Sequence, residues 1–246
     1  MVDLHCHIIP YIDDGARNIG IAYAMAKYAY KSGVDTIVAT PHCNLRDTRK
    51  NYYDREYIQM FALFKAFLKQ RGLEIEILPG SEVFAHADNI RYLVENEKLA
   101  TINHSRYLLV EFPFHQNEYL ISETLAAIAR RGLVPIVAHP ERYDCVQANP
   151  ALVGRWFEQG HVIQVNKGSL LGRLGRGAYE CATQFLEDGL AHVIASDAHD
   201  MKYRPPGFFR LIQSQKIDPR YLKVLLETNP RRIISDEPLI NPEYID

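Results

Sequence analysis

Residue types that bind metal ions recur directly after short apolar segments of the chain. Val2-Asp3-Leu4 leads into His5-Cys6-His7, and the apolar segment His192–Ala195 leads into Asp197 and His199. Residues two apart on a strand point to the same side, so each pair can reach one ion. With the segments between them included, the candidate ligands are His5, His7, Asp14, His42, Glu82, Glu111, His139, Asp197 and His199. Side chains that follow buried parallel strands meet at one rim of the fold, so these residues predict a metal site there.

Each ligand pair taken alone also has an ordinary explanation. A single His-x-His arises by chance or in a core, and Asp14 or Asp197 alone fits a turn or a helix N-cap. The joint placement favours the metal site, because the remaining histidines do not share it. His161 and His192 precede strands and are interpreted as structural, while His86, His104 and His115 are interpreted as loop or surface residues.

The number and type of the candidate ligands indicate more than one ion. Nine nitrogen and oxygen ligands exceed the four of a structural zinc site, which usually includes cysteine. Two or three ions bridged by carboxylates fit better, and imidazole with carboxylate suits Mn, Fe or Zn. Clustered ions of this kind typically generate a hydroxide and clamp a phosphoryl group.

Two arginines follow ligands closely, and a cysteine motif offers a competing chemistry. Arg142 stands three residues after His139, and Arg204 five after His199, so both are candidates for binding phosphate oxygens. A rim of tyrosines, Tyr11, Tyr143 and Tyr203, could stack on an aromatic substrate.

The segment from His42 to Arg49 also spells H-C-x5-R, the cysteine-phosphatase signature. That chemistry needs a loop whose N–H groups converge on phosphate, and no glycine lies between Cys43 and Arg49, so the match is interpreted as coincidental.

The elements that must position these residues alternate along the chain. Helical stretches that end near Gly and are followed by short apolar strands are typical of βα units. The predicted strands are Val2–His7, Thr36–Thr40, Glu74–Leu78, Tyr107–Glu111, Val134–His139, His161–Val165 and Ala191–Ala195. The predicted helices are Ile19–Lys31, Tyr57–Leu68, Ile121–Arg130, Ala151–Phe157, Tyr179–Leu186 and Asp218–Leu226, with a last turn opened by Asn229-Pro230. We expect one domain over residues 1–236 and a loose tail over 237–246.

Composition excludes several classes of protein. The 246 residues carry a net charge of −2, which does not indicate a binder of the nucleic-acid backbone. No signal peptide and no apolar run near the roughly 18 residues of a membrane span is visible, so we expect a cytoplasmic protein without membrane insertion.

Four cysteines without C-x-x-C spacing are expected to be reduced thiols. Cys6 alternates away from the two histidines beside it and is expected to be a small buried residue. The oligomeric state stays open.

The motifs together resemble the PHP (polymerase and histidinol phosphatase) superfamily, and within it the bacterial tyrosine-protein phosphatases of capsule and exopolysaccharide operons, the CpsB/YwqE type. The resemblance runs from Met1 to about Ile234. It rests on Asp3–His7, Asp13-Asp14-Gly15, Thr40-Pro41-His42, Gly80-Ser81-Glu82, Glu111-Phe112, Ala138–Tyr143, Gln164-Val165-Asn166, Ala195–His199 and Arg204-Pro205-Pro206.

This resemblance implies a distorted seven-stranded (βα)7 barrel of PHP type, with a trinuclear, usually manganese, site at the rim formed by the strand C-termini. It implies one ion on His5, His7, Glu82 and Asp197, a second on Glu82, Glu111 and His139, and a third on Asp14, His42 and His199. Arg142 and Arg204 would grip the phosphate. The implied substrate is phosphotyrosine on the tail of a bacterial tyrosine kinase that controls polysaccharide chain length.

The prediction is therefore metal-assisted hydrolysis of a phosphotyrosine ester, in which the phenolate leaves readily because its pKa lies near 10. Two alternatives stay open. A histidinol-phosphatase-like enzyme would prefer a small phosphomonoester. A metal-containing partner-binding module would not hydrolyse phosphotyrosine when supplied with Mn²⁺.

Overall fold

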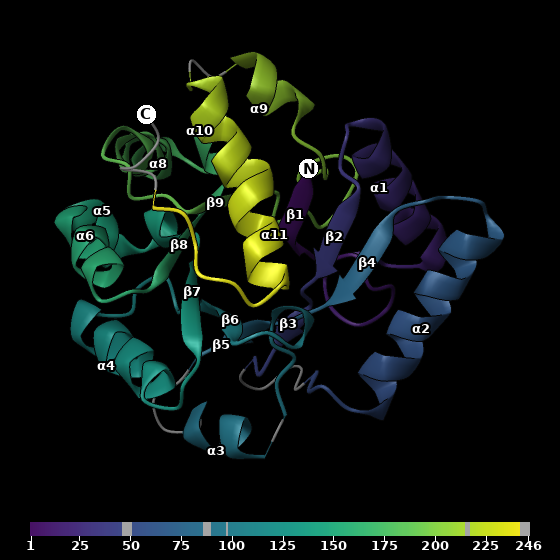
Figure 1. Cartoon of the computed structure of the whole chain (residues 1–246), viewed down its shortest axis with the longest axis horizontal. Coiled ribbons are helices and arrows are strands. Elements are labelled where there is room, and N and C mark those ends of the chain that lie inside the picture. The colour runs from purple at the N-terminus through teal and green to yellow at the C-terminus, as the bar shows by residue number, and fades with distance from the viewer. Residues whose placement is uncertain (46–50, 86–89, 97, 215–216, 242–246) are drawn as a thin grey trace.

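The computed structural model describes residues 1–45, 51–85, 90–96, 98–214 and 217–241, which form an α/β fold with parallel strands at its centre and helices around them (Figure 1). One sheet has the order β1-β2-β4, formed by Val2–Cys6, Thr36–Ala39 and Glu76–Pro79. The other has the order β3-β5-β6-β7-β8-β9, formed by His42–Cys43, Glu82–Phe84, Tyr107–Glu111, Val134–Ala138, Val162–Asn166 and Val193–Ala195. Every strand pair is parallel, so the strand C-termini share one rim.

The strands follow the apolar segments of the sequence, but the structure adds two short strands that were not predicted. The predicted strands Thr36–Thr40 and Glu74–Leu78 correspond to β2 and β4, and β3 and β5 begin after the two-residue gaps Thr40-Pro41 and Gly80-Ser81 and belong to the other sheet. The first strand and the segment that follows the last strand pair through an isolated parallel bridge between Cys6 and Ala198, not through a regular ladder. The parallel α/β class is confirmed, whereas a single closed sheet of seven strands is not.

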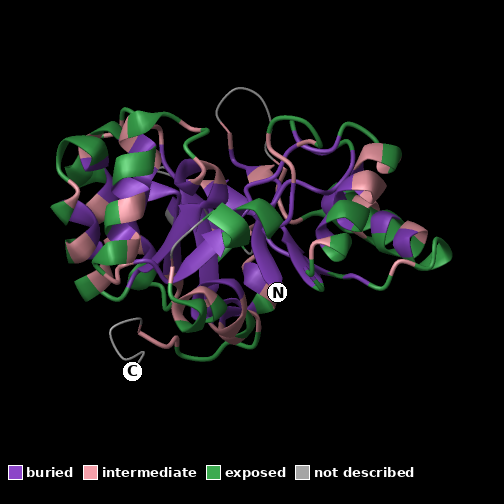
Figure 2. Cartoon of the chain, turned by 90° about the horizontal axis from the view of Figure 1, so that it is seen from above, coloured by how far each residue is buried: buried purple, intermediate pink, exposed green. Residues whose placement is uncertain are grey.

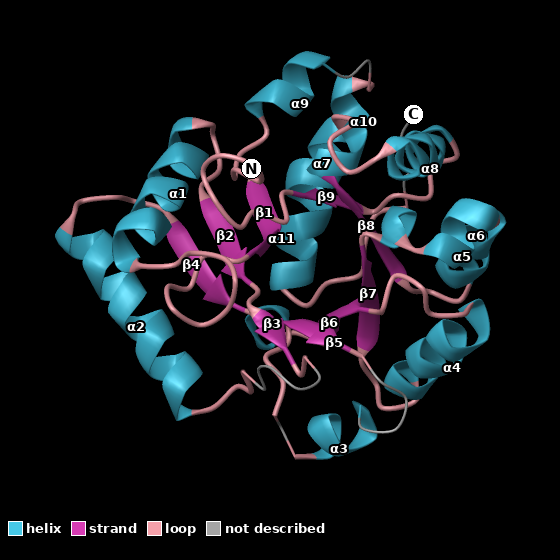
Figure 3. Ribbon diagram, turned by 180° about the vertical axis from the view of Figure 1, so that it is seen from behind, coloured by secondary structure: helices cyan, strands magenta, loops and turns pink. Residues whose placement is uncertain are grey.

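The longer helices lie close to the predicted positions. They are α1 (Ile19–Lys31), α2 (Arg55–Gln70), α4 (Glu118–Ala129), α6 (Ala151–Glu158) and α8 (Arg176–Glu187), seen around the strands in Figure 3. Side-chain caps fix several starts: Asn18 accepts from the N–H of Ile21, and Asn117 from that of Leu120. Gly33, at φ +86°, ends α1 in a conformation that L side chains rarely adopt.

Short helical elements complete the described part of the chain. They are α3 (Ile90–Glu95), α5 (Asp144–Ala148), α7 (Lys167–Leu170), α9 (Phe209–Ser214), α10 (Pro219–Lys223) and α11 (Asn229–Ile234), with 3₁₀ turns η1 (Ile102–His104) and η2 (Pro140–Arg142) and a π-helical turn η3 (Val224–Thr228). None of these helices, nor any other in the described ranges, is long and apolar enough to cross a bilayer.

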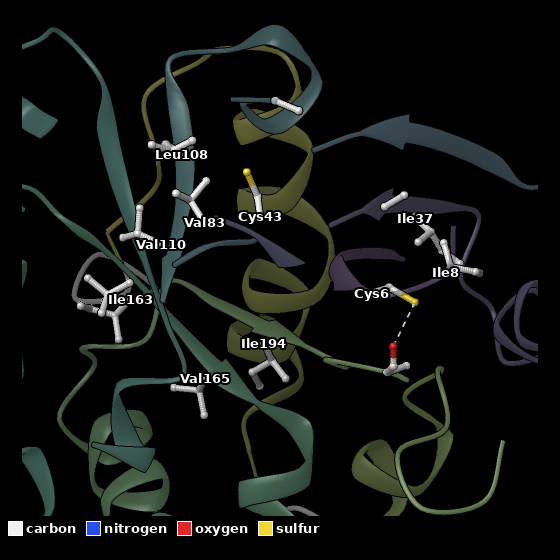
Figure 4. Packing of buried hydrophobic residues seen from close by; sticks show 14 of the residues in the cluster. Cys6, Ile8, Ile37, Cys43, Val83, Leu108, Val110, Ile163, Val165 and Ile194 are labelled. Carbon is white, nitrogen blue, oxygen red and sulfur yellow. Dashed lines mark hydrogen bonds between the residues drawn. The ribbon is translucent and has the colours of Figure 1, made fainter. Parts of the chain in front are cut away.

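The strands are buried and the outer helix faces are exposed, so the core lies between strands and helices (Figure 2). The sulfur-containing side chains of Cys6 and Cys43 belong to this core. They lie among aliphatic residues such as Ile37 and Val83, and the Cys6 thiol is 3.9 Å from the carbonyl of Ala198 (Figure 4). The expectation that Cys6 is a small buried residue is confirmed.

The segment after Asp236 is bound to the fold as far as residue 241, which contradicts the loose tail expected there. Tyr107 donates its hydroxyl hydrogen bond to the carbonyl of Glu237 at 2.6 Å. The buried Asn229 side chain binds both the carbonyl and the N–H of Ile240, at 3.0 and 2.9 Å. A short segment without apolar periodicity gave no sign of these backbone contacts. Residues 242–246 lie outside the described part.

Candidate metal centre

All nine predicted ligands lie together in one cluster, most of them at or after the C-terminal ends of strands, whereas His42 and Glu82 are the first residues of β3 and β5. Their nitrogen and oxygen atoms form overlapping groups with spacings within 4.8 Å. The groups are His7, Asp14, His42 and His199; His5, His139 and Asp197; His5, His7 and Glu82; and His42, Glu82 and Glu111. Because His5, His7, His42 and Glu82 each belong to two groups, the centre is one continuous cluster.

The first strand supplies two imidazoles to the middle of the cluster. His5 and His7 are fully buried, and their Nε2 atoms are 3.2 Å apart. The other ring nitrogen of each is used elsewhere: His5 Nδ1 is 2.9 Å from Gln164 Oε1, and His7 Nδ1 is 2.7 Å from Asp13 Oδ2. These contacts direct both Nε2 atoms toward the cluster, as partners outside a metal's ligand set do for ligating histidines.

Glu82, at the start of β5, is the carboxylate shared by most members. Its oxygens lie 3.3 Å from His5 Nε2, 3.2 Å from His7 Nε2 and 2.9 Å from both His42 Nδ1 and His139 Nε2. Glu111, at the end of β6, lies 3.6 Å from His139 Nε2 and 3.7 Å from His42 Nδ1. A carboxylate with histidines on both sides is suited to bridging two ions.

Two neighbouring aspartates of the turn after β1 have different environments. The Asp14 carboxylate is largely exposed, 3.6 Å from His42 Nε2 and 3.5 Å from His199 Nε2. Asp13 is buried and contacts His7, and it also accepts from the N–H groups of Gly15 and His42. The sequence placed Asp14 in the site but gave no role to Asp13, which holds a ligand in position.

Asp197 joins the metal ligands to the two arginines. Its Oδ1 atom is 3.4 Å from the Nε2 atoms of both His5 and His7. Its Oδ2 atom contacts Arg204 and is 3.5 Å from Arg142 Nη1. Arg142 also lies over the ring of Phe114, 4.4 Å from the centroid. Both guanidinium groups are partly exposed at the edge of the cluster.

The backbone of two ligands is strained. His139 has φ +35° and Asp197 has φ +49°, a region that residues other than glycine rarely occupy. Such conformations persist where the surroundings impose them, commonly at functional sites. At Asp197 the surroundings include the carbonyl of His5, which accepts from the Asp197 N–H at 2.8 Å.

A buried polar network behind the ligands connects β8 to β1 and β9. Gln164 contacts His5 through its oxygen and donates from its amide to Asn166 Oδ1 at 2.9 Å. Asn166 in turn donates to Asp197 Oδ2 at 2.7 Å. Glu141 accepts from the Asn166 N–H and from the Ser169 hydroxyl. Gln164, Asn166 and Glu141 lie in motifs of the sequence, but the sequence gave them no role, since buried amides and a buried glutamate have no distinctive spacing. Ser169 was not singled out at all.

The charges of the cluster shift its pKa values strongly. Burial, together with the negative charge of Glu82, raises the pKa of Glu111 to about 8. Burial also disfavours ionised Glu82, but the nearby His5 and His42 outweigh it and hold the pKa of Glu82 well below its usual value. For His139 burial lowers the pKa to about 4, so this imidazole is neutral, the form that binds metal.

Unpaired buried atoms of the ligands fit divalent cations. His42 Nδ1, Glu82 Oε2, Asp197 Oδ1 and His199 Nε2 have no hydrogen-bond partner within the described part of the chain. Buried polar atoms without partners are costly, and these four, with His139 Nδ1, are the five of the eight such atoms in the described residues that belong to the predicted ligand set. The donor set, imidazole nitrogen with carboxylate oxygen, suits Mn, Fe or Zn.

The structure also bears on the predicted tyrosine rim and on the cysteine motif. Tyr143 is not part of an aromatic rim, because it is fully buried and donates to the carbonyl of Ala138. Tyr11 and Tyr203 are largely exposed. Cys43 is buried in the core, and burial raises the pKa of its thiol to about 12, so it is a poor nucleophile. Arg49 of the same motif lies outside the described residues.

The remaining histidines lie away from the cluster. His161 and His192 are buried at the starts of β8 and β9, at the other end of the strands from the ligands. His104 lies in η1 beside Tyr53, and His115 is exposed and paired with Asp144. His86 lies outside the described part of the chain.

Comparison with known proteins decides the family. The model for capsular polysaccharide synthesis proteins of the CpsB/CapC type matches residues 1–235. The chain belongs to the CpsB/CapC family. It is 33% identical to the tyrosine-protein phosphatase YwqE of Bacillus subtilis, with 83% of this chain and 79% of YwqE covered. It is 32% identical to the tyrosine-protein phosphatase CpsB of Streptococcus pneumoniae, with 96% and 99% covered.

Solved structures extend the comparison of this CpsB/CapC family member. A structure from work on YwqE and CpsB, described as unique metal-dependent tyrosine phosphatases, superposes with a TM-score of 0.87 at 28% identity, covering 98% of this chain and 96% of the other. The phosphotriesterase of Mycobacterium tuberculosis superposes with a TM-score of 0.60 at 12% identity, covering 97% and 95%. At that identity the second likeness concerns the fold alone.

Proposed function

We propose that this chain is a metal-dependent protein-tyrosine phosphatase that acts in capsular or exopolysaccharide synthesis. The observation that carries the proposal is the convergence of His, Asp and Glu ligands from β1, β5, β6, β7 and β9 on a rim edged by Arg142 and Arg204. Membership of a family whose curated relatives are named tyrosine-protein phosphatases supports it.

The metal ligands and the two arginines have separate proposed roles. The nine ligands would hold two or three ions, with Glu82 shared among the ligand groups, and Mn²⁺ is the proposed metal with Fe or Zn as alternatives. Such ions, when bound, activate water and neutralise charge on a phosphoryl group. Arg142 and Arg204 bind the phosphoryl oxygens and stabilise the charge that grows there. Asp197 holds both guanidinium groups at the edge of the cluster until phosphate binds.

The proposed substrate is phosphotyrosine on the tail of a bacterial tyrosine kinase. The deciding experiment measures the metal content of the purified chain and its turnover of a phosphotyrosine peptide before and after chelation. We expect Mn²⁺ to restore activity that the chelator removes. Faster turnover of histidinol phosphate than of the peptide would favour the small-molecule alternative. No hydrolysis with Mn²⁺, together with partner binding that survives His139→Ala, would favour a binding module.

The cysteine mechanism is tested by Cys43→Ala. Because the Cys43 side chain contacts the core rather than the ligands, we expect this variant to retain most of the turnover of the unaltered chain. A loss of more than about a hundredfold in a folded Cys43→Ala variant, with activity unaffected by chelators, would contradict the metal mechanism.

A further inference from the structure

A basic groove lies beside the metal centre, and of its lining residues only Arg204 has a role in the proposed phosphatase chemistry. It is lined by five cationic side chains, Lys167, Arg173, Lys202, Arg204 and Arg210, together with the aromatic rings of Tyr28, Tyr203 and Phe209, and it encloses about 740 Å³. It runs between α7, α9 and the end of α1, which Figure 3 shows on one side of the molecule.

The charge of this groove differs from that of the chain as a whole. The full sequence has a net charge of −2, yet none of the described residues that line the groove is acidic. Arg173, Lys202 and Arg210 form no ion pair with a carboxylate in the ranges that the structure describes, and all three are exposed. The nearby Asp200 is engaged by its own loop, where its Oδ1 accepts from the N–H groups of Lys202 and Tyr203 at 2.6 Å. Three cations are therefore available to an anionic ligand.

One loop borders both the groove and the metal centre. Met201, Lys202 and Tyr203 line both the groove and a smaller hollow of about 290 Å³ that contains Asp14 and His199. Arg204 lines the groove and contacts Asp197. Lys167 fixes the far side of the loop by donating to the carbonyls of Pro205 and Gly207 at 2.6 and 2.7 Å. The groove is thus adjacent to the metal centre, on the side from which residues flanking a bound phosphotyrosine could reach it.

We propose that the groove binds an acidic segment of the substrate polypeptide next to its phosphotyrosine. This inference rests on the proposed phosphatase function and adds a specificity to it. Carboxylates of the segment pair with Arg173, Lys202 and Arg210, and its apolar side chains pack on Tyr203 and Phe209, which are 70% and 57% exposed. Arginine suits this role because its planar group binds carboxylates bidentately.

The test compares two phosphotyrosine peptides that differ only in flanking residues, Asp and Glu in one and Asn and Gln in the other. The unaltered chain with Mn²⁺ should show about tenfold higher kcat/KM for the acidic peptide, and this preference should fall with added salt. In Arg173→Ala/Arg210→Ala the ratio of the two kcat/KM values should approach one. The control Arg130→Ala changes an exposed arginine directly after α4, which does not line the groove, and should keep the ratio.

A binding measurement separates this proposal from the phosphatase proposal. Fluorescence anisotropy follows a labelled acidic peptide that carries tyrosine without phosphate. Binding that the double variant weakens, with no hydrolysis of either phosphopeptide, would support the groove and contradict the phosphatase. Hydrolysis of both phosphopeptides at equal kcat/KM would overturn the groove and leave the phosphatase intact. Stronger binding of single-stranded nucleic acid than of the acidic peptide would also overturn the groove's assignment.

Discussion

At the scale of single residues, three histidines of the cluster present one ring nitrogen to the centre and use the other outside it. The outer partners are Gln164 for His5, Asp13 for His7 and the carbonyl of Asp197 for His199. The histidines themselves were predictable because their type and position after strands are distinctive. The partners were not, since a buried amide such as Gln164 is recognised only when its contacts are seen. The sequence likewise could not show that Asp13 holds His7 while Asp14 lies among the ligands, because this depends on the conformation of the turn after β1.

Gln164→Ala removes the contact that orients His5 and the amide that supports Asn166. We expect the affinity for Mn²⁺ to fall about 10- to 100-fold, because outer partners fix the orientation and basicity of a ligating imidazole. Calorimetric titration of the metal-free chain with Mn²⁺ measures this without reference to activity. Gln184→Ala makes the same change at an exposed position of α8 and should leave the affinity unaltered. Equal affinities in both variants would remove Gln164 from the site.

At the scale of elements, the sequence predicted the long strands and helices well because apolar runs and helix-ending glycines mark them. It missed α3, α7 and α9 because helices of four to six residues are too short to show a helical period. It also missed β3 and β5, which begin two residues after β2 and β4 end. Between β4 and β5, Gly80 approaches Val38 of the neighbouring strand β2 so closely that an added Cβ would lie 2.7 Å from its Cγ1. That proximity joins residues far apart in the sequence and is invisible in a local pattern.

The turn after β1 depends on a glycine. A Cβ on Gly15 would lie 2.2 Å from the carbonyl oxygen of His7, so Gly15→Ala must displace the turn that carries Asp13 and Asp14. We expect kcat/KM to fall at least about tenfold, since small displacements of positioned groups are costly in catalysis. Gly154→Ala on α6 is the matched control because nothing lies within 4 Å of its added Cβ. This control should be stabilised by about 0.5–1 kcal/mol. Equal kinetics in the two variants would contradict the role of the turn.

The start of β9 makes the stability of the fold sensitive to acid. His192 Nδ1 lies 3.1 Å from the Ile163 N–H, its ring stacks on Phe157, and burial lowers the pKa of His192 to about 4. The unfolded chain binds this proton near pH 6.5, so the stabilising contribution is present above that pH and is lost as the pH falls toward 4. At pH 5 the loss is roughly 2 kcal/mol.

His192→Asn keeps an acceptor for Ile163 and removes the titration. Urea unfolding at pH 7 and pH 5 should therefore show a smaller fall in the free energy of unfolding for the variant than for the unaltered chain, by roughly 2 kcal/mol. An equal fall in the free energy of unfolding for the variant and the unaltered chain would mean that His192 does not titrate between pH 7 and pH 5.

At the scale of the whole molecule, the metal ligands connect the two sheets of the fold. Between β1 and the segment after β9 the sheets are joined by an isolated bridge and by backbone hydrogen bonds rather than by a regular ladder, and His5 and His7 from the first lie against Glu82 and Asp197 from the second. Without ions, their carboxylates and imidazoles include buried atoms with no partner in the described ranges. Bound cations would therefore stabilise the joint between the sheets as well as supply the chemistry.

The consequence is a thermal stability that depends on metal. A ligand that binds only the folded state at 100 times its Kd adds about 2.7 kcal/mol. In a domain of this length we expect Mn²⁺ at that excess to raise Tm by roughly 5–10 °C. Glu82→Gln should greatly reduce this shift because it removes the charge of the shared carboxylate, whereas His192→Asn, at the opposite end of the strands, should retain it. Calorimetric scans of both variants with and without Mn²⁺ measure the difference. A shift of the same size in Glu82→Gln would mean that the stabilising ion binds outside the cluster.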